Sequence, residues 1–583
     1  MEPVIRIEKG KKTERTLGIR KFDSVLFASA LESIVSILIA MSDTAITGHI
    51  VGEKGLSAMN VVSPIISFTI FLEGLFSVGT CMLYARCLGR FEKESAEKTF
   101  GMGLEITALT GIIMFLLVRL SLPFYTRFLG IHGEILDNVN LYMRFLSIKM
   151  MISPLFALVS QMVLTDGAEY LSMAAETTRS VMNVILSIWL GRHFGIAGIG
   201  MGTLISLLLG ALVLVPHFFS KHNSLYFKLS FHRRDFLEIL LFGWNDSAMF
   251  FVMPILFFLV NKYVMMRFGE YYLPCLAVMY SVIEFTDIFE ATGEALRTLL
   301  PIYIGDKNPE GIKRLSLHSL RVNLVLGLTS GALLLATAGL MPILFDLTDP
   351  GLVPLCVRGL RMYAFGWPML SLLAMFNSYY LNAGKLSYAM YEMILVQLVC
   401  PLAALVPASL VMGFPGIFSG FVISPYLAAL ILFVTLRLPN KKKGFPIYLK
   451  DADSIFVLFD GMTLTPEKIV AFTKKTADFL RERDVSSQIS LHVQISVEDG
   501  LMTVLERNSD KKVYAECCVR SEPGGVNLSI WDSGGAFDIG EEDAPVTSFR
   551  SFVVNSLMEN IGAKKNMIVS GFNRSSFYFP LSQ

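Results

Sequence analysis

Long apolar runs recur along most of this chain, and they constrain its fold more than any other feature. Each run is about 20 residues long, the length that an α-helix needs to cross the hydrocarbon core of a bilayer. The chain has 583 residues, of which 53% are hydrophobic and only 17% charged, whereas soluble domains are about 25% charged. The composition favours a polytopic α-helical membrane protein over a large soluble helical protein.

Hydropathy predicts about twelve spanning helices. Their starts fall near Ser24, Met59, Phe100, Val139, Glu169, Ala197, Leu237, Leu273, His318, Val353, Lys385 and Pro415. Lys and Arg are frequent in the leader 1–23 and in alternate loops such as GRFEKESAEK, whereas the intervening loops, such as MGFPG, nearly lack them. The positive-inside rule then predicts a plasma-membrane protein with both termini in the cytoplasm.

An internal repeat divides the spanning region. Three pairs of segments match at an offset of about 217 residues: FLEGLF (71–76) with IFEATG (288–293), GRFEKES (89–95) with GDKNPEG (305–311), and AGIGMG (197–202) with PGIFSG (415–420). We therefore expect two homologous six-helix lobes, 24–220 and 221–438, in the same orientation. Two such lobes around a cleft are typical of a transporter that works by alternating access, and nothing resembles the selectivity filter of a channel.

Four acids lie in the apolar stretch IEFTDIFEATGEALR (283–297). Glu284, Asp287, Glu290 and Glu294 are spaced by three, three and four residues, so on an α-helix they fall within an arc of about 120°. That face cannot meet lipid. The spacing predicts an acidic lining of the cleft, or of the C-terminal lobe, that attracts small organic cations.

Such acids cannot all be ionised at close range, so at least one takes up a proton or pairs with Arg297 or Lys262. In the repeat, Glu290 corresponds to Glu73, which predicts a symmetry-related pair in the cleft. The alternative is a structural polar network between helices.

Another acid, Asp43, lies near the outer end of the first predicted span. A carboxylate at mid-depth costs about 2.5–3.5 kcal/mol or more unless it is paired, protonated or hydrated. It can bind a small hard cation or, when desolvated, carry a proton near neutral pH. The alternative is a helix-end residue satisfied by water or backbone.

Several patches between about residues 20 and 438 resemble the multidrug and toxic compound extrusion (MATE) family. They are SDTAITGHIVGEKGLSAMNVVSPI (42–65), SVGTCMLYARCLGR (77–90), NVILS (183–187) and AGIGMGT (197–203). The resemblance implies export of cationic and aromatic compounds in exchange for sodium ions or protons. Members of the family are secondary transporters, not enzymes, and need no cofactor.

The resemblance also implies a cation site in the N-terminal lobe. In many bacterial members it consists of an Asp on helix one, an Asn and an Asp on helix five, and a Thr on helix six. Asp43, Asn183 and Thr203 match, whereas Ser187 replaces the second Asp. The loss of one negative charge implies a weaker sodium site or a proton site centred on Asp43. No clear match exists for the family's acid on helix seven.

After a basic linker, 439–449, the sequence becomes charged and polar, with stretches in which polar and apolar residues alternate. This pattern predicts a cytoplasmic α+β domain over 450–583. SIWDSGGAFDIGEEDAP (529–545) resembles the first glycine box of the GHKL ATP-binding fold of anti-sigma-factor kinases, with Asp532 and Gly534 in the adenine-binding positions. The preceding helix offers Glu498 or Asp499 for the catalytic Glu, and Thr503 in place of the magnesium-binding Asn. No glycine-rich lid follows, so we expect a degenerate domain that binds ATP or a cytoplasmic regulatory protein.

These observations lead to three candidate functions. The first is a cation-coupled exporter of small organic compounds with a regulatory domain. The second is a lipid-linked-saccharide flippase of the same superfamily, which would need a cationic cleft for pyrophosphate. The third is a membrane-tethered sensor. No cysteine spacing predicts a metal site, and a net charge of +1 argues against nucleic acid as a partner.

Overall fold

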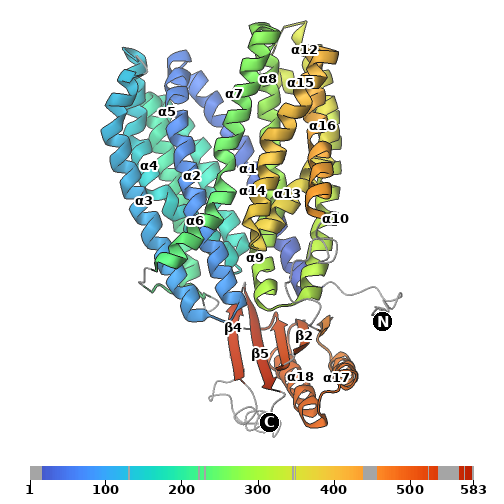
Figure 1. Ribbon diagram of the computed structural model, residues 1–583. Coiled ribbons are helices and arrows are strands. Elements are labelled where there is room, and N and C mark those ends of the chain that lie inside the picture. The colour runs from blue at the N-terminus through green and yellow to red at the C-terminus, as the bar shows by residue number, and fades with distance from the viewer. Residues whose placement is uncertain are drawn as a thin grey trace. The chain divides into compact units, whose positions relative to one another are not determined.

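The computed structural model describes residues 16–128, 131–220, 223–228, 232–344, 347, 349–437, 456–522, 524–535, 563–569 and 571–580. They form two compact units (Figure 1). The larger unit contains the described residues of Phe22–Lys307 and Ile312–Lys450. The smaller unit contains those of Met1–Lys21, Asn308–Gly311 and Asp451–Gln583.

The larger unit is helical, and its first half forms an N-terminal bundle. The elements of this bundle are α1 (Leu17–Ile50), α2 (Glu53–Gly89), α3 (Lys93–Phe128), α4 (Glu134–Thr165), α5 (Glu169–Leu214) and η1 (Val215–Phe219). Helix α4 packs on α2, α3 and α5. Apolar side chains such as Met114, Leu146 and Ile199 form a core of their own between them.

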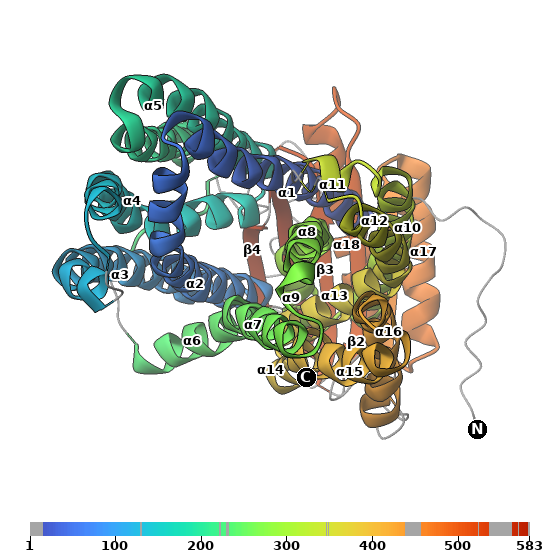
Figure 2. The same ribbon diagram turned by 90° about the horizontal axis from the view of Figure 1, so that it is seen from above.

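The second half forms a C-terminal bundle, preceded by α6 (Arg233–Ser247), which packs on α2. The elements are α7 (Met249–Arg267), η2 (Glu270–Tyr272), α8 (Leu273–Glu284), η3 (Phe285–Glu290), α9 (Ala291–Gly305), α10 (Pro309–Thr337), α11 (Met341–Leu344), α12 (Leu352–Tyr363), η4 (Ala364–Gly366), α13 (Trp367–Asn382), α14 (Leu386–Ile394), η5 (Leu395–Val399), α15 (Cys400–Met412), α16 (Pro415–Leu432) and η6 (Phe433–Arg437). Its separate core includes Met279, Trp367 and Phe418. Figure 2 shows α2–α5 on one side of the unit and α10, α12, α13, α15 and α16 on the other.

Helix α5 contains two of the predicted spans in one element. At Gly195 the backbone takes φ 60° and ψ −140°, a conformation that glycine adopts without steric cost. After this kink the chain runs back along itself, because a Cβ placed on Gly202 would lie 2.8 Å from the backbone nitrogen of Ser187. The small residues of AGIGMG therefore allow the two arms of a helical hairpin to pack closely.

Seven helical segments of the described chain are long and apolar enough to cross a membrane. They are Pro64–Gly89, Lys93–Phe128, Glu134–Thr165, Glu169–Phe219, Pro309–Thr337, Leu386–Met412 and Pro415–Leu436. The predicted class, a polytopic helical membrane protein, is confirmed, whereas the total of about twelve spans remains a prediction. Breaks in the helices lower the count: α8 and α9, for example, are separated by the 3₁₀ segment η3.

The two bundles meet where α2 and α9 end. Gly89 closes α2 and Gly305 closes α9, and these glycines are counterparts in the sequence repeat. A Cβ on Gly305 would lie 2.5 Å from the carbonyl carbon of Gly89, and a Cβ on Gly89 would lie 2.8 Å from the carbonyl oxygen of Pro301. The contact is thus main chain against main chain.

The smaller unit contains a five-stranded sheet and two helices. Its elements are β1 (Phe456–Thr463), α17 (Pro466–Arg481), α18 (Ser487–Arg507), β2 (Tyr514–Glu522), β3 (Gly525–Asp532), β4 (Ala563–Val569) and β5 (Phe572–Pro580). The strand order is β1-β2-β3-β5-β4, and every neighbouring pair is antiparallel. Thr465 and Ser486 cap the two helices with their side-chain oxygens. Side chains from both helices and from one sheet face, among them Phe472, Val497 and Ile530, form the core.

Replacing Gly305 by alanine tests the contact between α2 and α9. The added methyl group overlaps the Gly89 backbone, so the helix ends must separate. We expect a loss of about 1–3 kcal/mol in unfolding free energy, measured as a lower thermal midpoint in detergent. Gly339→Ala is the control, because nothing lies within 4 Å of a Cβ at that position. Equal midpoints for the two variants would contradict the contact.

Candidate functional site

A cavity of about 730 Å³ lies between the two bundles. Helices α1 and α2 contribute Glu32, Ser33, Ser67 and Ile70, and the C-terminal bundle contributes the rest of the lining. Its volume is within the range of about 300–1,000 Å³ that is usual for small-molecule sites. The cavity is therefore large enough for a drug-sized compound.

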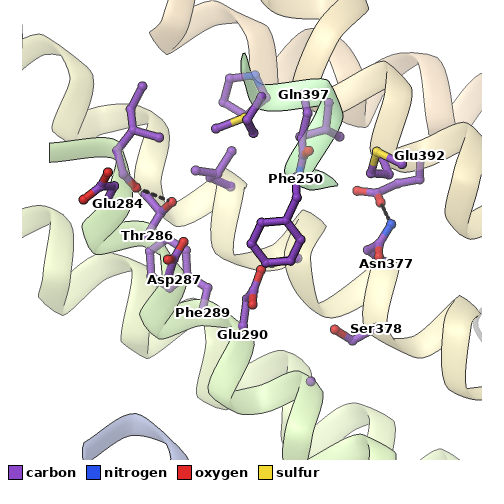
Figure 3. Close-up of a pocket in the computed structure, with 18 of the residues that line it drawn as sticks. Phe250, Glu284, Thr286, Asp287, Phe289, Glu290, Asn377, Ser378, Glu392 and Gln397 are labelled. Atoms are coloured by element: carbon purple, nitrogen blue, oxygen red, sulfur yellow. Dashed lines mark hydrogen bonds between the residues drawn. The ribbon is translucent and has the colours of Figure 1, made fainter. Parts of the chain in front are cut away.

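All four acids of the predicted stripe line this cavity. Glu284 ends α8, and the chain then runs through η3, a 3₁₀ helix, rather than through the α-helix that the arc of about 120° assumed. In a 3₁₀ helix residues three apart eclipse one another, so the spacing of Glu284, Asp287 and Glu290 places all three on one side. Figure 3 shows the three carboxylates along one wall.

The fourth acid of the stripe is paired. Glu294 Oε1 lies 3.0 Å from Arg297 Nη1, with the two side chains 20% and 8% exposed. The Arg297 guanidinium also donates a 3.4 Å hydrogen bond to Gln161 Oε1 on α4. Arg297 thus joins the two bundles, while the predicted alternative, Lys262, is an exposed residue on α7.

Opposite the stripe lies an acid that the sequence analysis missed. Glu392 on α14 is 2% exposed, lines the cavity and accepts a hydrogen bond from Asn377 Nδ2 (Figure 3). The π-helical segment η5 follows directly and brings Gln397 to the same cavity; such single π turns are frequent at functional sites. The signal in the sequence was a lone acid in the apolar run YEMILVQLV. An ionisable side chain in a spanning helix costs free energy, so it usually faces a cavity or a partner and marks a functional site. Glu32 on α1 was missed in the same way.

The prediction for Glu73 needs correction. The structure places its carboxylate inside the N-terminal bundle, where Lys149 Nζ lies 4.0 Å away and Ser153 Oγ donates a hydrogen bond to it. Glu73 does not belong to the described lining of the cavity. Its counterpart Glu290 lies in a 3₁₀ segment, whereas Glu73 lies within the α-helix α2, so the two side chains point in different directions.

The predicted cation group lies in the N-terminal bundle. Asn183 and Ser187 are buried on the first arm of α5, and Ser187 Oγ donates a 3.5 Å hydrogen bond to Asn183 Oδ1. The hairpin at Gly195 brings the turn of Thr203 next to them. Asp43 belongs to α1, but its side chain lies outside the described residues. In the described part of the chain, no group of three or more His, Cys, Asp or Glu residues is arranged to hold a metal ion.

In the smaller unit, Asp532 ends β3 and is 1% exposed. Its Oδ1 accepts 2.9 Å hydrogen bonds from the Gly534 amide and from Asn573 Nδ2, whereas its Oδ2 has no partner among the described residues. Burial raises the pKa of this carboxyl to about 6, although the two hydrogen bonds oppose the shift. A buried acceptor without a partner is costly, so this oxygen is suited to accept a hydrogen bond from a ligand.

Three other predicted nucleotide residues lie on α18. Glu498, Asp499 and Thr503 are half-buried on α18. The residue of this helix end that contacts the glycine turn is Asn508, whose Oδ1 accepts a 2.8 Å hydrogen bond from the Gly535 amide. A Cβ on Gly534 would lie 2.6 Å from Asn508 Nδ2, so the position has no room for a side chain. The segment 547–562, where a lid was missing from the sequence, lies outside the described residues.

The fold and the cavity define a helical membrane protein with a cavity between two bundles. The MatE family model matches residues 28–189 and 247–405, more than half of the chain. The chain therefore belongs to the MATE family, whose members are secondary transporters and not enzymes.

Individual relatives are distant. The multidrug export protein MepA of Staphylococcus haemolyticus (strain JCSC1435) is 22% identical over 266 residues, which cover 44% of this chain and 58% of that protein. A crystal structure of MATE in complex with MaL6 superposes with a TM-score of 0.68 at 19% identity, covering 74% of this chain and 98% of that chain. An outward-facing multidrug resistance MATE transporter gives 0.67 at 19% identity, with 74% and 100% covered. These similarities establish the fold.

The raised pKa of Asp532 predicts a pH-dependent stability. Because the folded-state pKa of about 6 exceeds the usual value of about 3.9, folding favours the protonated acid, and the contribution of this group to stability falls as pH rises from about 4 to 6. We expect Asp532→Asn to raise the unfolding free energy at pH 7.5 by about 1–3 kcal/mol. The gain should vanish at pH 4.

Urea unfolding of the full-length protein, followed by the fluorescence of Trp531 and the other tryptophans, measures this effect. Asp510→Asn is the control, because Asp510 is an exposed acid of the same unit. A gain that is the same at both pH values would contradict the raised pKa.

Proposed function

We propose that this protein is a cation-coupled exporter of small organic cations, which bind in the acidic cavity between the bundles. The observation that carries the proposal is the lining of that cavity. Among the described residues of the lining, six are acids, Glu32, Glu284, Asp287, Glu290, Glu294 and Glu392, and one is basic, Arg297. Membership of the MATE family and the similarity to a multidrug export protein support the same reading.

Charge and shape both suit a lipophilic cation. Arg297 is 3.0 Å from Glu294, so the acids of η3 and Glu392 dominate the field in the cavity. Aromatic rings of Phe250, Phe257 and Phe289 also line the cavity, and a cation over such a ring gains about 0.5–2 kcal/mol. Carboxylates supply the charge attraction, and rings supply an adaptable apolar surface.

Coupling would use acids that gain and lose a cation during the cycle. We assign the coupling cation, a sodium ion or a proton, to Asp43 with Asn183, Ser187 and Thr203, which offer oxygen ligands suited to a hard cation. Neutralising Asp43 from outside would change packing in the N-terminal bundle and loosen the bound cation. The drug then leaves outward, and the bundles rock back around the cavity.

A lipid-linked-saccharide flippase fits the cavity less well. Pyrophosphate carries negative charge, and the ionised acids of the lining would repel it. A membrane-tethered sensor is the third candidate, and it is favoured if the vesicle assay detects no transport. We place the protein in the plasma membrane with both termini in the cytoplasm, as the loop charges predict.

For the residues after the basic linker we propose a regulatory role, with ATP or a regulatory protein as the ligand. Asp532 Oδ2 is the acceptor that an adenine amino group would reach. Glu498, Asp499 and Thr503 would face the phosphates, but Thr503 lacks the amide that binds magnesium in active kinases. Binding without efficient phosphate transfer is therefore expected.

Uptake into everted vesicles, whose outer surface is the cytoplasmic face, tests the transport proposal. A fluorescent lipophilic cation is added outside the vesicles, its accumulation in the lumen measures export, and sodium and pH gradients are imposed separately. We expect one gradient to drive export and Asp43→Asn to abolish it. Glu290→Gln should raise the KM about tenfold, because the loss of one charge contact of about 1.4 kcal/mol changes affinity by that factor.

Asp137→Asn is the control, because Asp137 is an exposed acid at the start of α4. It should transport as the wild type does. If neither gradient moves any of several cations in inserted, folded protein, the exporter proposal fails. If an unchanged KM in Glu290→Gln accompanies normal export, the acidic stripe does not bind the substrate.

Binding of a fluorescent ATP analogue to the full-length protein tests the regulatory proposal. We expect Asp532→Ala to weaken binding at least tenfold, because the buried acceptor proposed for the base is removed. Asp510→Ala should bind as the wild type does. Equal affinity for the wild type and Asp532→Ala would exclude a nucleotide at this site and leave a protein as the ligand.

A further inference from the structure

The two faces of the sheet in the smaller unit carry different side chains. Ala515, Cys517 and Val519 of β2 belong to the core beneath α17 and α18. The alternating residues Tyr514 and Glu516 therefore point to the other face. Glu516 is only 2% exposed, and a carboxylate buried to that degree requires hydrogen-bond donors.

Part of the required donor set comes from the first turn of α1, which belongs to the same compact unit as the sheet. The backbone amide of Gly18 donates a 2.7 Å hydrogen bond to Glu516 Oε1. The guanidinium carbon of Arg20 lies 3.7 Å from the ring centre of Tyr514. Thr16 packs on β1, where a Cβ on Gly461 would lie 2.9 Å from its Cγ2.

These contacts complete a helix end. The first amides of a helix have no intrahelical acceptor, and the helix dipole places partial positive charge there. Glu516 supplies both an acceptor and a negative charge, and the stacked Arg20 adds a cation–π contact. The sheet thus caps α1 with groups that are about 500 residues away in sequence.

We call these contacts of Glu516 and Tyr514 with the first turn of α1 the grip. Beyond the grip, helix α1 carries residues of the cavity and of the proposed coupling site. It carries Glu32, which lines the cavity, and Asp43 of the proposed coupling site. In the next turn Asp23 Oδ1 lies 2.6 Å from His318 Nε2 of α10, so the start of α1 is also joined to the C-terminal bundle. Movement of the first turn of α1 would therefore shift side chains that contact both bundles.

We propose that the C-terminal sheet restrains transport by gripping the first turn of α1 through Glu516 and Tyr514. The predicted topology, in which α1 crosses and α2 returns, puts the first turn of α1 and the end of α2 on the same side of the membrane. At that side α2 and α9 are in contact at Gly89 and Gly305. Holding α1 there stabilises this contact, and releasing α1 lets the bundles separate more readily. This regulation rests on the proposed transport function.

The grip is connected to the buried acid of β3. The Ser533 amide donates to the Tyr514 carbonyl, and the Tyr514 amide donates to Ser533 Oγ, each at 3.0 Å. Ser533 directly follows Asp532 and precedes Gly534, which donates to that acid. A ligand at Asp532 would thus act on the same residue that stacks on Arg20.

The test compares two readouts in the full-length protein. Hydrogen–deuterium exchange of the amides of residues 17–21 reports the grip, and gradient-driven export reports its effect. We expect Glu516→Ala to speed exchange about tenfold, as the loss of a good helix cap would, and to raise the export rate at least twofold. Arg20→Gln, which leaves the sheet untouched, should change both readouts in the same direction.

Glu506→Ala is the matched control, because Glu506 is an exposed acid of the same unit, and it should alter neither readout. Exchange of the β2 and β3 amides shows whether Glu516→Ala remains folded. Unchanged exchange of residues 17–21 in both variants would disprove the grip. Faster exchange with an unchanged export rate would disprove its control of transport. If the wild-type protein exports nothing, the proposed function fails, while the exchange comparison still decides whether the grip exists.

Discussion

The need to place carboxylates inside an apolar helical unit governs the rest of this structure. Lipid offers no partner for an ionised acid, so each acid must face a cavity, a base or a hydrogen-bond donor. Glu73 contacts Lys149 and Ser153, and Glu294 pairs with Arg297. Another five acids, Glu32, Glu284, Asp287, Glu290 and Glu392, line one cavity between the two bundles.

Irregular helix geometry lets the acids share that cavity. The 3₁₀ turn η3 carries two acids of the stripe, and the π turn η5 follows Glu392 on the opposite wall. Each departs from the regular α-helical bond pattern, and both lie where polar side chains enter the cavity. The irregular turns and the site thus occur together.

Sequence reasoning located some of this and missed the rest for identifiable reasons. The stripe from Glu284 to Glu294 could be predicted because four acids at short spacing must share a polar side, whatever the helix type. Glu73 was misplaced because a repeat fixes chain position but not the local helix geometry. Glu392 was missed because a single acid carries no spacing pattern, and the grip on α1 depends on residues far apart in the chain, Gly18 and Glu516.

The contact between Gly89 and Gly305 joins the two bundles without charged side chains. A contact made of ion pairs strengthens or weakens as its own groups titrate or bind ions. A contact of opposed glycine backbones has no side chain to titrate, and its fit depends on shape. A change in ions or ligands can therefore alter this contact through the helices that position α2 and α9.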